Sequence, residues 1–126
     1  MLTIKRLDIE DANRLIAGAR AKAIEIGVPM CVAITDESGN LIAFERMNGG
    51  KITSINLAID KSFTAVGIQK GTDALGEVNQ PGMPAHGISS TLGGRMVTIA
   101  GGLPVTFEGQ VVGGVGVSSG SPAQDY

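Results

Sequence analysis

Residues 101–118 read GGLPVTFEGQVVGGVGVS, and this stretch decides the fold class. Apolar β-forming residues fill 103–107 and 110–118, and Glu108-Gly109 between them has the composition of a tight turn, so the stretch predicts two antiparallel strands. The glycines in it belong to a wider excess: the chain has 19, about twice the usual share of roughly 7%. Most of this excess lies between Gly82 and Gly120, where it indicates turns, bulges and close approaches of the backbone.

The chain before this stretch predicts two long helices and three further strands. Residues 9–26 carry apolar side chains at three- and four-residue spacing, after Asp8 as an N-cap and before Gly27 as a terminator. Residues 53–69 predict the second helix. Strands are expected at 30–35, 41–47 and 96–100. Because strands and helices do not alternate regularly, we predict one α+β domain with an antiparallel sheet of about five strands packed with helices.

The helix expected at 53–69 is apolar nearly all round. One stripe holds large side chains, a second holds small ones, and the opposite side still carries Leu57 and Ile68 beside Thr64 and Lys61. A helix of this kind is buried on more than one side, and a chain of 126 residues has little interior to cover it. The sequence therefore predicts a homo-oligomer, a dimer or larger, with this helix at or near the contact.

Composition excludes several classes of function. The net charge is −2, the ten Lys and Arg residues are scattered, and only three Phe and one Tyr could stack on bases, which disfavours nucleic-acid binding. No apolar run reaches the roughly 20 residues that cross a membrane. A single Cys31 and a single His86 form no disulfide and no zinc pattern. The polar, acidic start does not read as a signal peptide, so a cytoplasmic location is expected.

An ordered set of short motifs runs through most of the chain. They are Phe44-Glu45-Arg46-Met47, Gln80-Pro81-Gly82, Gly101-Gly102-Leu103-Pro104, the run VVGGVGVS at 111–118, and Gln124-Asp125. Together they resemble the GlcG/HbpS-like family, also called the haem-degrading domain family, which includes the C-terminal domain of PduO-type proteins. The resemblance implies a single profilin-like domain over residues 1–126 that assembles into dimers and higher oligomers. It also implies haem or a corrinoid as a ligand in some relatives, and catabolism of small acids in others.

Two features depart from that family pattern. Relatives usually continue after the Gln-Asp pair with a full alanine-rich helix, whereas here a helix begins at Ser121-Pro122 and the sequence ends at Tyr126. The C-terminal helix is therefore expected to be cut short. Some haem-binding relatives use a histidine near the N-terminus, and residues 9–26 hold none.

Several residues are candidates for a ligand site. The glycines of Gly101-Gly102 can aim backbone N–H groups at an anion or a carbonyl, although a β-bulge would use them equally well. Residues 79–95 form a long Pro- and Gly-rich loop, which is more often functional than idle. The predicted ligand-binding residues are Arg46, Gly82, Arg95, Gly101, Gly102 and Pro104. The predicted catalytic residues are Lys61, if it is desolvated, and His86, whose ordinary pKa lies near neutrality.

These candidates support three hypotheses of function. In the first, a cleft between residues 79–95, 101–104 and 53–69 holds a planar carboxylate-bearing ligand such as a tetrapyrrole. No metal site is expected unless haem binds, in which case His86 is the strongest nitrogen donor for the iron. In the second, the same cleft is the active site of a lyase, isomerase or deaminase, with Arg46 anchoring a small organic acid and His86 or Lys61 moving protons. In the third, the protein is a structural oligomer without a ligand.

Overall fold

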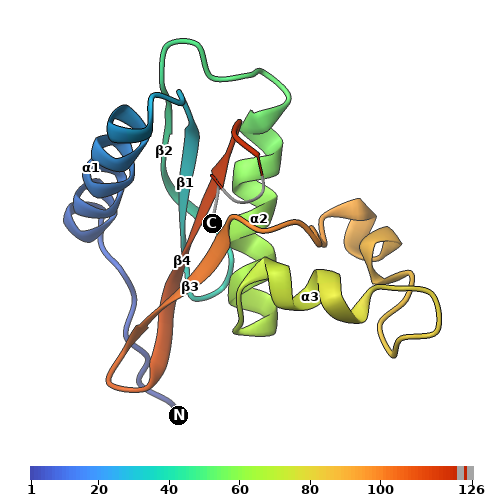
Figure 1. The fold of residues 1–126 in the computed structure, drawn as a ribbon. Coiled ribbons are helices and arrows are strands. Elements are labelled where there is room, and N and C mark those ends of the chain that lie inside the picture. Colours follow the sequence, from blue (N-terminus) through green and yellow to red (C-terminus); the bar gives the residue numbers. More distant parts are fainter. Residues whose placement is uncertain (122–123, 125–126) are drawn as a thin grey trace.

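The computed structural model describes residues 1–121 and 124, in which three helices pack on a four-stranded antiparallel sheet (Figure 1). The helices are α1 (Ile9–Ile26), α2 (Ser54–Ile68) and α3 (Thr72–Val78). The strands are β1 (Cys31–Asp36), β2 (Leu41–Arg46), β3 (Gly102–Phe107) and β4 (Gln110–Ser118), and the sheet has the order β2-β1-β4-β3. The α+β class and the antiparallel pairing of the sheet are confirmed.

Helix α1 has the two ends that the sequence predicts. The Asp11 N–H donates to the Asp8 carboxylate at 2.8 Å, and the Asp8 N–H donates back to the Asp11 carboxylate at 3.0 Å. Gly27 ends the helix in the left-handed conformation, with φ of 73°, which glycine adopts without steric cost. Between these ends, Ala12 and Ile16 pack in one buried cluster with Val32 and Ile34 of β1. Helix α1 therefore covers one face of the sheet over β1 and β2 (Figure 1).

Helix α2 covers the other face, and glycines of the sheet bring it close. A Cβ added to Gly116 of β4 would lie 1.9 Å from the Ala58 carbonyl oxygen, and one added to Gly114 would lie 2.9 Å from that of Ser62. Gly102 of β3 has the same relation to Lys61, at 2.4 Å. No side chain fits in these places, so helix backbone lies directly against strand backbone. The close approach expected from the glycine excess is confirmed at these three positions.

This arrangement decides which stripe of α2 is buried. The small side chains Ala58, Ser62 and Ala65 are fully buried against the sheet, and the Ser62 hydroxyl lies 2.6 Å from that of Thr35. Of the large-residue stripe, Val66 is buried, whereas Ile55, Ile59 and Phe63 are half-buried and Ile52 is exposed.

The fifth strand expected at 96–100 is wrong. Met96 and Val97 are buried, as their apolar character predicts, but their segment pairs with a side chain rather than with a strand. The Thr64 hydroxyl donates to the Arg95 carbonyl oxygen at 3.0 Å and accepts from the Val97 N–H at 3.0 Å. A single threonine of α2 therefore takes the place of a neighbouring strand.

The loop at 79–95 is mostly exposed and contains two short 3₁₀ turns, Ile88–Ser90 and Leu92–Gly94. Figure 1 shows that it extends with α3 to the side of α2 that is remote from α1. None of the described helices is long and apolar enough to cross a bilayer.

At the end of the chain, Ser121 and Gln124 form a capping box, because the Gln124 N–H donates to the Ser121 hydroxyl and the Ser121 N–H donates to the Gln124 side chain. Pro122 at the first helical position and the end of the helix at Asp125 and Tyr126 lie outside the described residues.

Candidate functional site

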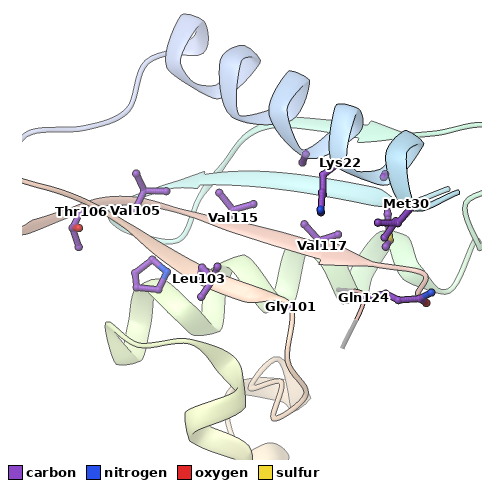
Figure 2. Close-up of a pocket in the computed structure, with 13 residues that line it drawn as sticks. Lys22, Met30, Gly101, Leu103, Val105, Thr106, Val115, Val117 and Gln124 are labelled. Atoms are coloured by element: carbon purple, nitrogen blue, oxygen red, sulfur yellow. The ribbon is translucent and has the colours of Figure 1, made fainter. Parts of the chain in front are cut away.

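A groove with a volume of about 850 Å³ lies between α1 and strands β3 and β4, which form one half of the sheet. Its origin lies in the layer arrangement: α1 covers Val32 and Ile34 of β1 and leaves the same face of β3 and β4 open. Figure 2 shows the side chains of Leu103, Val115 and Val117 on these strands below α1. The lining residues used below are Ala23, Ile26, Leu103, Val105, Val115 and Val117, with Lys22 and Met30.

The walls of this groove are apolar, and its few polar groups are placed singly. Lys22 extends from α1 toward the strands (Figure 2), and its ammonium lies 3.5 Å from the Glu25 carboxylate. Met30 is only 2% exposed and contributes to the lining, so this methionine belongs to the buried floor of the groove. An apolar ligand with a carboxylate suits this combination of hydrocarbon walls and one cation.

A second cavity of about 230 Å³ lies where the end of β4 meets the first turns of α2. Lys61 is part of its wall and is only 2% exposed. Its ammonium donates to the Val117 carbonyl oxygen at 2.9 Å. Lys51 also lines this cavity and lies on the surface.

The predicted ligand-binding glycines and proline divide between the groove and the fold itself. Gly101 and Pro104 line the groove. The N–H of Gly102 donates to the Thr72 hydroxyl at 3.0 Å, and Gly102 is buried against α2, so this N–H is already used within the fold. Gly82 is exposed and adopts φ of 85°, as a turn glycine does.

The predicted charged residues do not line a common cavity. Arg46 is exposed at the end of β2. The Arg95 guanidinium lies 3.8 Å over the centre of the Phe63 ring, and its Nε donates to Asp60 at 2.9 Å. His86 is exposed in the loop at 79–95, where its backbone N–H donates to the Met83 carbonyl oxygen. Neither the groove nor the smaller cavity has Arg46, Arg95 or His86 among its described lining residues.

Cys31 packs as expected for a buried strand residue. It is fully buried in a cluster with Ala33 and Ala58. Burial raises the pKa of its thiol, and a hydrogen bond with Ser119 and the charge of Arg46 oppose that rise only in part. The thiol is therefore protonated at neutral pH, and Cys31 acts as a small apolar side chain.

Sequence reasoning missed most of the groove, although some of its signals were present. Lys22 lies three residues after Ala19 and four before Ile26, on the apolar side of α1 that the spacing predicts. In β4, valine and glycine alternate at 114–117, which places Val115 and Val117 together on the face opposite α2. The missing information was which half of the sheet α1 covers.

Comparisons with known proteins agree over nearly the whole chain. A family model described as "Haem degrading protein HbpS-like" matches residues 7–126. An uncharacterized 15.0 kDa protein of the dhaT-dhaS intergenic region of Citrobacter freundii is 35% identical over 97% of this chain and 86% of that protein. The corrinoid adenosyltransferase PduO of Salmonella typhimurium is 36% identical over 94% of this chain, which spans only 35% of PduO.

Two solved structures have the same fold. The Klebsiella pneumoniae protein ORFY is 31% identical, with a TM-score of 0.97 over 99% of this chain and 86% of ORFY. The structure of the PduOC:heme complex is 36% identical, with a TM-score of 0.91 over 95% of this chain and 87% of PduOC. The solved complex shows that a relative with this fold is a haem-binding protein.

Proposed function

The chain belongs to the HbpS-like family, and on that premise we propose that it is a homo-oligomeric small-ligand-binding protein that holds a haem or another tetrapyrrole in the groove between α1 and β3–β4. The observation that carries this proposal is the haem complex of PduOC, a relative 36% identical to this chain over 95% of its length. The similarity to PduO, a corrinoid adenosyltransferase, is the reason that the proposed ligands include a corrinoid as well as haem.

The residues of the groove fit the apolar part of such a ligand. Its volume of about 850 Å³ lies within the range of roughly 300–1,000 Å³ that is typical of small-molecule sites. Leu103, Val105, Val115 and Val117 would cover the macrocycle. The Lys22 ammonium would pair with a carboxylate at the rim. A bound haem would supply a redox-active iron.

The iron donor is the weaker part of the fit. Haem iron takes His, Cys, Met or Tyr as ligands, and among the described lining residues only Met30 offers one of these. His86 does not line the groove, so it would reach an iron there only from a second copy of the chain. A single thioether supports weak ligation, and we therefore expect haem to bind weakly.

A visible-range titration with haemin tests the proposal. The wild type should give a saturable shift of the Soret band, and Met30→Leu, which conserves volume, should change the position of that band. Lys22→Met should weaken binding about tenfold, which is the effect of one charge-assisted hydrogen bond, whereas Lys70→Met, an exposed lysine outside the groove, should leave it unchanged. A wild type with no spectral change would refute the proposal. A Soret shift that is lost in His86→Ala and kept in Met30→Leu would assign the iron ligand to His86 instead of Met30.

The small-acid enzyme has weaker support in its predicted form. Arg46, His86 and Lys61 were expected around one substrate, and Lys61 alone lies in a described cavity wall. The observation that still favours a small acid is the composition of that cavity.

A further inference from the structure

The cavity beside the start of α2 is polar in a way that the groove is not. It lies where the end of β4 approaches the first turns of α2 (Figure 1), and three separate segments form it. Its polar lining consists of two lysines and four hydroxyl-bearing residues, Lys51, Lys61, Thr53, Ser54, Ser118 and Ser119. Leu57 and Ile99 supply its hydrocarbon wall.

The two lysines differ in depth. Lys61 is 2% exposed, and the hydrogen bond from its ammonium to the Val117 carbonyl oxygen fixes where its charge lies. Lys51 is at the exposed rim. A charge held in a buried wall interacts with an anion more strongly than a solvated one, because the surrounding dielectric is lower. The cavity therefore has one lysine held in its buried wall and one exposed lysine at its rim.

The hydroxyl groups come from both elements that meet here. Ser54 and Ser118 are buried, and Thr53 makes no capping hydrogen bond with its side chain. Ser119 has φ of 120°, a backbone conformation that is rare for residues other than glycine, and its hydroxyl accepts from the Lys51 N–H at 3.0 Å. Ser54 and Leu57 belong to the first turn of a 15-residue helix, and Thr53 is its N-cap residue. The positive end of this helix favours an anion at the same place.

The size of the cavity limits the anion. A volume of about 230 Å³ corresponds to the share of roughly seven or eight liquid waters, at about 30 Å³ each. We propose that this cavity binds a small organic carboxylate of about two to four carbons, with its carboxylate toward Lys61 and Lys51 and its carbon chain against Leu57 and Ile99. This site is separate from the groove that we propose for a tetrapyrrole.

Titration of ¹⁵N-labelled protein with acetate, oxalate and succinate tests the site. At least one acid should give saturable shifts concentrated at residues 51–57 and 118–120, and acetamide, a neutral analogue of acetate, should give none. Lys51→Met should weaken the acid about tenfold, and Thr53→Val should weaken it less. Lys70→Met, an exposed lysine at the far end of α2, is the matched control and should bind as the wild type does. Lys61→Met should abolish binding, and the spectrum of the free variant reports whether it is folded.

Three results would overturn the inference. They are an absence of saturation by all three acids, an equal affinity in wild type and Lys51→Met, and sulfate binding as tightly as the best acid, which would show an anion site without a preference for carbon. The Soret titration of Lys51→Met keeps the two proposals apart. That variant should bind haemin as the wild type does. A failure of the carboxylate proposal therefore does not affect the haem proposal, and a failure of the haem proposal does not affect the carboxylate proposal.

Discussion

At the scale of single residues, one ion pair fastens the N-terminal segment to the β1–β2 turn. The Arg6 guanidinium donates to both carboxylate oxygens of Glu37, with Nε at 2.7 Å from Oε2. This pair lowers the pKa of Glu37 to about 2 from its usual value near 4.5. Local patterns in the sequence give no sign of this pair, because Arg6 and Glu37 lie 31 positions apart.

We expect Glu37→Gln to reduce the free energy of unfolding at pH 7 by less than about 1 kcal/mol, since Arg6 is half-exposed and solvent screens the pair. The folded pKa is depressed, so the wild-type contribution is complete above about pH 4.5 and is lost as the pH falls toward about 2. Urea denaturation at several pH values measures this. The difference between variant and wild type should shrink across that window, and a constant difference would contradict the assignment.

The candidate site shows what residue types can and cannot reveal. Lys61 was predicted because a lysine stood among apolar neighbours, and its burial follows from that pattern. Arginine is as common in ligand sites as lysine, but the Arg95 side chain already forms a hydrogen bond with Asp60 and lies over the Phe63 ring. Chemistry could be read from the sequence, whereas the partner of each charge depends on contacts between distant segments.

At the scale of elements, sequence patterns predicted an element correctly where the contacts that determine it lie within the same segment. Helix α1 was predicted to its last residue because its caps and its apolar face lie within one segment. The strand expected at 96–100 failed because Thr64, more than 30 residues earlier, supplies the hydrogen bonds that a neighbouring strand would have supplied.

The glycine contact between α2 and β4 makes a strong prediction. Gly116→Ala should destabilise the protein by about 3 kcal/mol or more, because the new methyl group meets rigid backbone at Ala58. Gly67→Ala on the same helix is the control. Its added Cβ meets nothing within 4 Å, and the higher helix propensity of alanine should stabilise the protein by about 0.5–1 kcal/mol. Guanidinium denaturation compares the two, and similar effects would show that α2 does not lie this close to the sheet.

At the scale of the whole molecule, several large apolar side chains remain on the surface near the start of α2. Ile52 is 74% exposed and Ile99 46%, and Leu57 lies beside Ile99 in the wall of the smaller cavity. Such a patch is typical of a contact between subunits. The subunit contact predicted from the apolar character of α2 is therefore expected near the N-terminal end of this helix.

We expect the protein to be at least a dimer, and we expect Ile52→Asp to weaken or abolish assembly. Ile24→Asp is the matched control, because Ile24 is 66% exposed on α1, away from this patch. Light scattering on dilute protein measures the mass. A wild type at the 12.9 kDa of one chain would refute the oligomer, and an equal effect of both substitutions would refute this location.

The strand order has a consequence for how the chain folds. Strands β1 and β2, like β3 and β4, are joined by tight turns, whereas the central pairing of Cys31 with Ser118 joins residues nearly 90 positions apart. Closing so long a loop costs entropy before any contact rewards it, and such topologies fold slowly. We therefore expect two independent hairpins to form early and their seam to close in the rate-limiting step. In pulsed hydrogen exchange, amides that bond across β1 and β4 should become protected last.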